Sequence, residues 1–310
     1  SMDAMLSLSH VSFSYHTLGG ETLALRDISF SVGFGEFAAI VGPSGCGKST
    51  LLSLICGLIQ PESGAITMAG KPTAAGSPGI GYMLQRDHLF EWRTVYDNVL
   101  LGLEIQKKLT VENRRRVEQM LETYGLSAFA GMKPSALSGG MKQKLALCCA
   151  LVHKPSVLFL DEPTTGVDAV SRKDFWTMLG RIRQSGVTVS VSTPYMDEAS
   201  LCDRLALIKD GEIIGTGTPS QITSRYPYRI LAVKGRNMYP LLKALRQIDG
   251  VESCFSFGDC HHLAYRPEST SRETILAEAA GMGFPDCTAK DITPGIEDCF
   301  MQLSKKWKQE

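Results

Sequence analysis

A glycine-rich run early in the chain has the residue types and spacing that bind phosphate. Gly42-Pro43-Ser44-Gly45-Cys46-Gly47-Lys48-Ser49 matches G-x-x-x-x-G-K-[ST], and Thr50 follows it. Its glycines let successive backbone N–H groups turn toward phosphates, and Lys48 can reach the β- and γ-phosphates. The Ser49 hydroxyl is the expected Mg²⁺ ligand. The run predicts a Mg-ATP site; a chance glycine-rich turn is the alternative.

The elements around this run are those that a phosphate loop requires. The apolar segment Phe37 to Val41 predicts a buried strand, and Lys48 to Leu58 predicts the helix that follows it. Further strands are expected at 79–85, 156–161 and 187–192, with a helix at 169–184. This alternation is typical of a wound α/β core with parallel strands.

A second chemical feature is a pair of acids at the end of an apolar strand. Val157-Leu158-Phe159-Leu160-Asp161-Glu162 brings Asp161 to the carboxyl edge of the predicted sheet, near the expected metal. Glu162 can then polarise the attacking water. A helix cap or a solvated pair is the alternative for two acids taken alone.

The rest of the chain indicates two domains. The ATPase domain is expected at 3–222, with an all-helical part at about 86–155 in which Thr110 and Ser138 can cap helices. Asp210-Gly211 predicts a hairpin. From 226 to 306 the order of predicted elements is βαββαβ followed by a helix, which predicts a small ferredoxin-like α+β accessory domain.

The motifs in their chain order resemble the nucleotide-binding domain of ABC transporters over about residues 6–218. They are the phosphate loop, Gln85, the segment Leu137-Ser138-Gly139-Gly140-Met141 and the acidic strand end. The serine and two glycines at a predicted helix start can hold an anion, although this signal is weak by itself. The resemblance implies a P-loop NTPase (RecA-like) core with a helical subdomain, and hydrolysis of ATP as a transporter subunit.

The same resemblance implies further site residues and partners. Ser138-Gly139-Gly140 would contact the γ-phosphate of an ATP held by a second copy, giving a homodimer with two sandwiched ATP molecules. Gln85 would join the Mg²⁺ shell and sense a membrane-spanning subunit. Asp168 would cross the dimer interface, and Tyr15 would stack on adenine. As a lone residue, Tyr15 is more often part of a core.

Two positions depart from the family pattern. Met141 stands where glutamine is usual, and the neighbouring serine and glycines can still supply the anion contacts. Pro194 stands where most of the family has a histidine that touches the γ-phosphate. Proline can neither donate a hydrogen bond nor carry a proton. We expect Glu162 to suffice as base; the alternative is a nucleotide-gated clamp with little hydrolysis.

The two halves of the chain resemble different branches of the family. Residues 85–103 look like the ATPases of sulfonate-, taurine- and nitrate-type importers. From about Leu137 onward, the chain is similar to multidrug-type (ABC-2) exporter ATPases, including the ending Pro294-Gly295-Ile296-Glu297-Asp298. Either the chain is a divergent exporter ATPase, or it is a chimera joined near 125–134 that has no native transport partner.

Composition limits the other possibilities. The 310 residues carry 32 basic and 32 acidic side chains, so no nucleic-acid partner is expected. Nine cysteines without a Cys-x-x-Cys pair indicate a reducing compartment. Apolar stretches are far shorter than the ~18 residues of a membrane span. With a transmembrane partner, the chain is expected to be cytoplasmic and peripheral on the inner face of the cell membrane.

Two remaining clusters are expected to be structural. Cys254, Cys260, His261 and His262 fall around a predicted hairpin whose alternating side chains point to opposite faces, so no metal is expected there. Arg114-Arg115-Arg116 is expected to form a solvated helix face.

Overall fold

The structure, a computed structural model, describes residues 4–73, 79–83 and 89–307. The chain divides into two compact units, Ser1–Pro219 and Ser220–Glu310, each with its own sheet and core. The predicted magnesium ligand Gln85 lies outside the described residues. Among the helices of the described ranges, none combines the length and the apolar character needed to cross a membrane.

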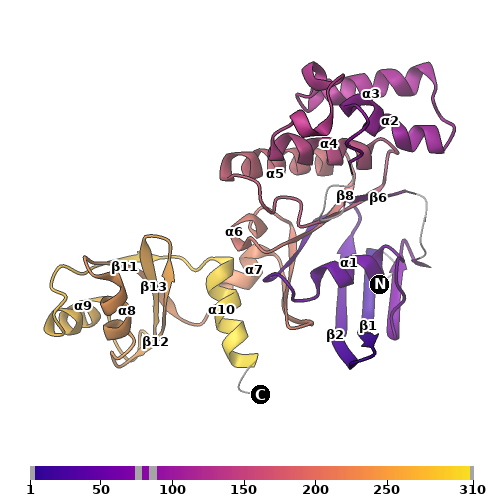
Figure 1. Cartoon of the computed structure of the whole chain (residues 1–310). Helices are drawn as coiled ribbons and strands as arrows, with labels where there is room; N and C mark the ends of the chain where they lie inside the picture. The colour runs from indigo at the N-terminus through magenta and orange to yellow at the C-terminus, as the bar shows by residue number, and fades with distance from the viewer. Residues whose placement is uncertain (1–3, 74–78, 84–88, 308–310) are drawn as a thin grey trace. The chain divides into compact units, whose positions relative to one another are not determined.

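The central sheet of the first unit has six strands in the order β10-β9-β3-β8-β7-β6. Two of them, β6 and β8, are labelled in Figure 1. The strands are β3 (Phe37–Val41), β6 (Ile80–Met83), β7 (Val157–Asp161), β8 (Thr188–Thr193), β9 (Arg204–Lys209) and β10 (Glu212–Gly217). Strand β3 is parallel to both β8 and β9, and β6, β7 and β8 are parallel to one another. Every residue of β3, β7 and β8 is buried, as expected for a parallel sheet covered on both faces. The predicted wound α/β core and the β9–β10 hairpin are confirmed.

A second, antiparallel sheet in this unit was not predicted. It has the order β2-β1-β4-β5, formed by β1 (Ala4–Thr17), β2 (Gly20–Gly33), β4 (Ser63–Met68) and β5 (Lys71–Pro72). Four register shifts interrupt the pairing of β1 with β2, so the alternation of apolar and polar residues is broken. Helix α1 (Lys48–Ile55) shares one apolar cluster with this sheet and with β7.

The helical part of the first unit contains α2 (Val95–Ile105), α3 (Val111–Thr123) and α4 (Gly139–Leu151), with two short 3-10 turns between α3 and α4. The hydroxyls of Thr94, Thr110 and Ser138 cap these helices, as predicted for the last two. The helices enclose a separate apolar cluster. In α3, Arg114 and Arg115 are exposed, whereas Arg116 is partly buried. Helices α5 (Ala169–Gln184) and α6 (Met196–Ala199) follow β7 and β8.

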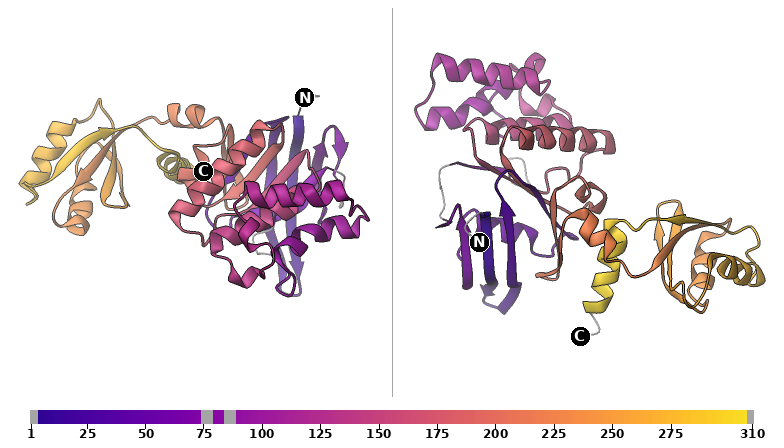
Figure 2. Two further views of the ribbon diagram at one scale, coloured as in Figure 1. Left: turned by 90° about the horizontal axis from the view of Figure 1, so that it is seen from above. Right: turned by 180° about the vertical axis from the view of Figure 1, so that it is seen from behind.

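Helix α7 (Pro219–Ser224) begins at the last residue of the first unit, and the second unit continues as a four-stranded antiparallel sheet. Its elements are β11 (Arg229–Lys234), α8 (Met238–Leu245), β12 (Val251–Phe257), β13 (Cys260–Tyr265), α9 (Arg272–Gly281), β14 (Thr288–Ile292) and α10 (Ile296–Trp307). The strand order β12-β13-β11-β14 with α8 and α9 on one face is the ferredoxin-like arrangement (Figure 2).

Helix α10 contacts the other face of that sheet. His262 Nδ1 lies 2.8 Å from Asp298 Oδ1 of α10, and the His262 ring stacks on Phe257. The neighbouring residue of the hairpin, His261, places Nε2 2.6 Å from the Met238 carbonyl oxygen. Cys254 is buried in the apolar cluster under α8 and α9. Cys260 Sγ lies 3.5 Å from the Phe257 carbonyl oxygen.

Candidate active site

The phosphate loop leaves the end of β3 and enters α1. Gly47 precedes the helix with a φ of 104°, a conformation that other residues rarely adopt. A Cβ at this position would lie 2.8 Å from Leu25 Cδ2 and 3.0 Å from the Ala24 carbonyl oxygen, so only glycine fits. A depression of about 480 Å³ opens beside the loop and is also lined by Tyr15. Pro43-Ser44-Gly45 is exposed at the tip of the loop.

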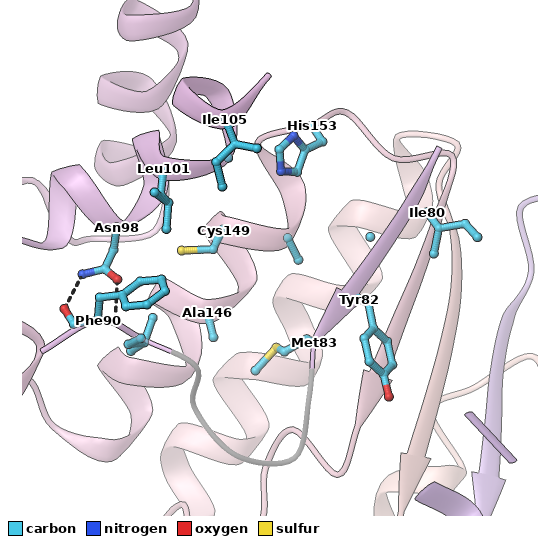
Figure 3. A pocket seen from close by; sticks show the side chains of 14 residues that line it. Ile80, Tyr82, Met83, Phe90, Asn98, Leu101, Ile105, Ala146, Cys149 and His153 are labelled. Atoms are coloured by element: carbon cyan, nitrogen blue, oxygen red, sulfur yellow. Dashed lines mark hydrogen bonds between the residues drawn. The ribbon is translucent and has the colours of Figure 1, made fainter. Parts of the chain in front are cut away.

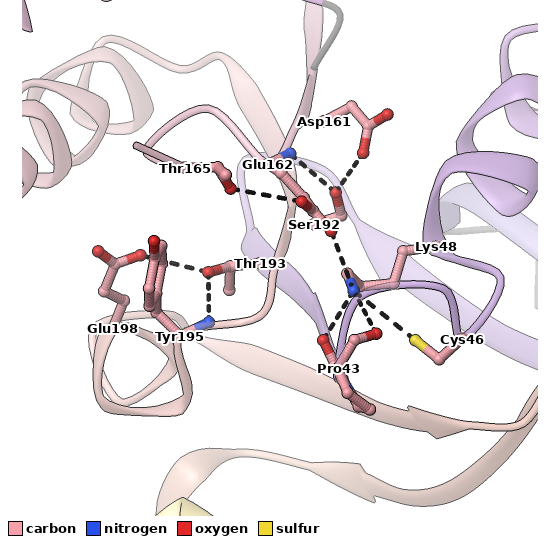
Figure 4. Close-up of polar contacts among 11 residues, drawn as sticks. Pro43, Cys46, Lys48, Asp161, Glu162, Thr165, Ser192, Thr193, Tyr195 and Glu198 are labelled. Atoms are coloured by element: carbon pink, nitrogen blue, oxygen red, sulfur yellow. Dashed lines mark hydrogen bonds and ion pairs between the residues drawn. The ribbon is translucent and has the colours of Figure 1, made fainter. Parts of the chain in front are cut away.

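Lys48 is directed back toward its own loop and toward the acidic strand end (Figure 4). Its Nζ donates to the carbonyl oxygens of Gly42 (2.7 Å) and Pro43 (2.8 Å) and lies 3.1 Å from Glu162 Oε1. The Lys48 and Glu162 side chains are only 2% and 4% exposed. The Cys46 thiol is 3.7 Å from the same Nζ, and burial raises the pKa of this thiol. A buried ion pair therefore joins the loop to the end of β7.

Asp161 is fixed by the strand next to it. Ser192 Oγ at the end of β8 donates a 2.7 Å hydrogen bond to Asp161 Oδ1 and accepts one of 3.0 Å from the Glu162 backbone N–H. Burial raises the pKa of Asp161, and hydrogen bonds from the Ser192 and Ser49 hydroxyls work against that rise. The parallel pairing of β7 with β8 brings these groups to one edge of the sheet.

The groups around Asp161 fit a magnesium ion. The Asp161 carboxylate and the Ser49 hydroxyl are oxygen donors, which Mg²⁺ prefers. Asp161 and Glu162 are two adjacent buried carboxyl groups beside one buried ammonium group, that of Lys48. A divalent cation would offset the remaining negative charge.

Tyr15 belongs to the antiparallel sheet, and its hydroxyl lies 2.8 Å from Thr50 Oγ1 at the start of α1. Tyr15 is 45% exposed, and its ring makes an edge-to-face contact with the Phe13 ring at a centroid distance of 5.1 Å. The exposed ring face borders the depression beside the loop. This position suits stacking on an adenine base.

Two of the residues predicted to complete the ATP site of a second copy, Ser138 and Asp168, cap helices. Ser138 Oγ accepts from the Met141 N–H at the start of α4, at 3.2 Å. Asp168 Oδ1 accepts from the Ser171 N–H at the start of α5, at 2.9 Å, and this bond lowers the pKa of Asp168. An ion pair between Lys144 and Asp174 joins the two helices. Gly139 and Gly140 form the first turn of α4.

The turn after β8 carries Pro194. The Thr193 carbonyl oxygen accepts from the Gly42 N–H at 3.2 Å, which attaches this turn to the phosphate loop. Thr193 Oγ1 accepts from the Tyr195 N–H at 3.0 Å. Pro194 has no N–H and no polar side-chain atom, so it offers a phosphate no donor.

Three residues of the site were not singled out from the sequence. Ser192 donates a hydrogen bond to Asp161, and Thr165 Oγ1 donates one to Glu162 Oε2 at 3.3 Å. The buried Glu198 accepts hydrogen bonds from Thr164, in the turn after β7, and from Thr193, at the end of β8. A polar residue at the carboxyl end of an otherwise buried strand was a usable signal for Ser192. Thr165 and Glu198 lie in loop and short-helix segments that carry no comparable pattern.

A second depression, of about 320 Å³, lies between β6 and the helical part (Figure 3). Its lining is mainly apolar and includes Tyr82 and Met83 of β6, Leu101 and Ile105 of α2, and Cys149 of α4. Asn98 accepts a hydrogen bond from the Phe90 N–H and donates one to the Phe90 carbonyl oxygen, which fixes the segment before α2. The Trp92 ring, 72% exposed, packs against Phe90 near this depression.

Known proteins are similar to this chain in both sequence and fold. The family model described as ABC transporter matches residues 25–165. The linearmycin resistance ATP-binding protein LnrL of Bacillus subtilis is 35% identical over 97% of this chain and 98% of its own length. The probable multidrug ABC transporter ATP-binding protein YbhF of Escherichia coli is 31% identical over 97% of this chain, which spans about half (52%) of YbhF.

Two solved structures are similar to this chain in fold. A dimeric post-hydrolysis state of the ATP-binding cassette MJ0796 with ADP and Pi has a TM-score of 0.63 at 29% identity, covering 69% of this chain and 98% of that chain. CbiO1 of Clostridium perfringens, described as part of the complex cbiONQ, has a TM-score of 0.65 at 30% identity, covering 72% and 92%.

LnrL also bears on the resemblance of the two halves to different branches. LnrL matches 97% of the chain, and the junction near 125–134 stays a hypothesis, because two joined halves of one family would also match a single relative. The sulfate/thiosulfate import protein CysA of Mycolicibacterium paratuberculosis matches only 66% of the chain, at 38% identity. The phosphate loop, the acidic strand end, the fold and these relatives together show the family. The chain belongs to the ATP-binding proteins of ABC transporters.

Proposed function

We propose that this chain binds Mg-ATP and hydrolyses it as the ATPase subunit of an ABC transporter. The observation that carries the proposal is the convergence of Lys48, Asp161 and Glu162 at one edge of the sheet. Lys48 Nζ is 3.1 Å from Glu162 Oε1, and Asp161 is held by Ser192. A phosphate-binding cation, a metal-binding acid and a candidate base therefore lie side by side.

Lys48 changes partners when a nucleotide binds. Its ammonium group leaves Glu162 and contacts the β- and γ-phosphates, together with the N–H groups of the loop from Gly42 to Thr50. Tyr15 stacks on the adenine. Ser49, Asp161 and Gln85 would hold the metal, and a bound Mg²⁺ would supply positive charge to neutralise the phosphates.

The chemical step depends on Glu162. Freed from Lys48, its carboxylate accepts a hydrogen bond from the attacking water and takes a proton from it as the water oxygen bonds to the γ-phosphorus. The bond between the γ-phosphorus and the β,γ-bridging oxygen breaks in the same step, and ADP leaves with that oxygen. Thr165 Oγ1 holds the other carboxylate oxygen, Oε2, at 3.3 Å. Glu162 is thus oriented by a neighbour even without a histidine at position 194.

A second copy of the chain completes the site. Ser138-Gly139-Gly140 of one copy contacts the γ-phosphate bound by the other, and Asp168 lies at the interface. Both segments are at helix N-termini, whose N–H groups and partial positive charge favour an anion. The dimeric state of the ATP-binding cassette MJ0796 with ADP and Pi supports this arrangement.

The membrane-spanning partner is proposed to dock at the depression shown in Figure 3, on the inner face of the cell membrane. Its apolar lining and the exposed Trp92 and Ile105 side chains suit a short helix of that partner. Copurification from membranes with wild-type protein, and its loss with Trp92→Glu, tests the docking. Unchanged recovery of the same membrane protein with Trp92→Glu rejects this surface.

Steady-state phosphate release tests hydrolysis itself. Glu162→Gln should lower kcat by about 10²-fold or more with nucleotide still bound, because general-base catalysis contributes about 10²- to 10⁴-fold. Equal, slow rates for wild type and Glu162→Gln would reject hydrolysis. That result would favour the alternative function, a nucleotide-gated clamp, for which Pro194 is the supporting observation.

A further inference from the structure

Glu198 of α6 is a buried acid for which the proposed hydrolysis step has no use. Its side chain is 8% exposed and accepts hydrogen bonds from two threonine hydroxyls. Thr164 Oγ1 lies 3.2 Å from Glu198 Oε2. Thr193 Oγ1 lies 3.3 Å from the same oxygen (Figure 4). Arg172 of α5 supplies the counter-charge, with Nη1 3.5 Å from Glu198 Oε1. One carboxylate therefore joins three separate segments.

The contact between Glu198 and Thr164 connects Glu198 to the candidate base, Glu162. Thr164 is adjacent in the chain to Thr165, whose hydroxyl donates to Glu162. Glu162 has a φ of 44°, in the left-handed region that is strained for a residue other than glycine. Such a conformation persists only where the surrounding structure holds it. The bond from Thr164 to Glu198 anchors the chain two residues beyond the strained position.

The contact between Glu198 and Thr193 connects Glu198 to the turn after β8, where Pro194 stands in place of the family's usual histidine. The Thr193 hydroxyl accepts from the Tyr195 N–H and donates to Glu198, and Pro194 lies between them. Arg172 lies over the Tyr195 ring at 4.2 Å, so the same arginine holds both the turn and the carboxylate. The turn is therefore fixed from inside the protein rather than by a side-chain bond to a phosphate.

We propose that Glu198 is a positioning residue for ATP hydrolysis: its carboxylate ties the strained segment after β7 to the turn after β8 and so holds the Glu162 carboxylate in its working orientation. The proposal rests on Glu162 being the base. Glu198 does not touch the substrate, and its effect passes through Thr164 and Thr165.

The test compares Glu198→Ala and Glu198→Gln in the full chain by steady-state phosphate release and thermal unfolding. Glu198→Ala should lower kcat at least about tenfold with the KM for ATP within about threefold, since small displacements of a reacting group are costly. Glu198→Gln should recover to within about threefold of wild type, because the amide oxygen still accepts from both threonines. The matched control is Asp203→Asn.

Asp203 makes a comparable set of contacts at the opposite end of β3. It binds Arg183 at 2.7 Å and accepts from the Phe37 N–H at 2.8 Å. The Asp203→Asn variant should lose thermal stability while its kcat stays unchanged. If Glu198→Ala keeps kcat within about twofold, or if Asp203→Asn loses as much kcat, the positioning role is wrong.

A double variant separates this inference from the proposed function. If Glu198 acts through Glu162, adding Glu198→Ala to Glu162→Gln should lower the residual rate by less than about twofold. A further loss of about tenfold would overturn the inference, because Glu198 would then act elsewhere. If Glu162→Gln alone leaves hydrolysis unchanged, the assignment of the base fails instead.

Discussion

Replacing Lys48 by methionine in protein purified without nucleotide should destabilise the first unit strongly. Methionine keeps the length of the side chain but removes the ammonium group. The change deletes the bonds to the Gly42 and Pro43 carbonyl oxygens and leaves the Glu162 carboxyl group, 4% exposed, without its 3.1 Å partner. Removing one member of a buried ion pair costs about 3–5 kcal/mol.

The expected loss appears in thermal unfolding. At about 2–4 °C per kcal/mol for a unit of this size, the Tm of Lys48→Met should fall by about 6–20 °C. Lys48→Met/Glu162→Gln should regain most of the loss, because the buried Glu162 charge is removed together with the lysine that balances it. The control is Lys144→Met, which breaks a 2.8 Å pair with the 54% exposed Asp174 and should cost less than about 1 kcal/mol.

Two results would refute the reasoning. A Tm for Lys48→Met within about 2 °C of wild type would mean that Lys48 and Glu162 are not paired in the absence of nucleotide. A double variant no more stable than Lys48→Met would mean that the lost ion pair with Glu162 does not cause the destabilisation. The KM for ATP is a poor readout here, because Lys48 is also expected to bind phosphate.

Three further outcomes are expected. Pro194→His should raise the kcat of phosphate release about tenfold or more by restoring a donor, and an unchanged kcat would show that position 194 does not limit the rate. Gly42→Ala should cost about 1–3 kcal/mol in urea unfolding, because its Cβ would lie 2.2 Å from the Ile208 carbonyl oxygen. Gly180→Ala, with no heavy atom within 4 Å, should gain about 0.5–1 kcal/mol; equal values for the two glycines would contradict the packing argument. Burial raises the pKa of Asp161 above 3.8 in the folded, nucleotide-free protein. The Asp161 side chain therefore contributes its full stabilisation below the pKa that it has in the unfolded chain, and this stabilisation is lost as pH rises through the raised folded-state pKa. The Asp161→Asn variant should therefore gain stability relative to wild type across that rise in a Tm-against-pH series, and a flat difference would contradict the sign.

The surroundings of the phosphate loop were predictable because each neighbour is marked locally. An apolar pentapeptide predicted β3, and the glycine pattern with Lys48 predicted the entry into α1. Thr110 and Ser138 marked helix starts, since a side-chain oxygen before an apolar run satisfies free N–H groups. The element order of the second unit was predictable for the same reason.

The contacts inside the site were not predictable in this way. The bonds from Lys48 to Glu162 and from Ser192 to Asp161 depend on β3, β8 and β7 being adjacent in one sheet. Strand order is a property of the whole core and leaves no trace in a local pattern. Glu198 was missed because its importance lies in hydrogen bonds to residues in other segments.

The order of strands in the central sheet also has a consequence for synthesis of the protein. Strand β3 ends just before the phosphate loop, but its neighbours β8 and β9 are not complete until Thr193 and Lys209 have been added. Pairing over such a separation is slow, because the entropy of closing the loop is lost before the contacts form. Helices α2, α3 and α4 contact one another more locally and can form earlier. A nascent chain that stops before β8 would therefore carry the complete phosphate-loop sequence without either strand that supports it.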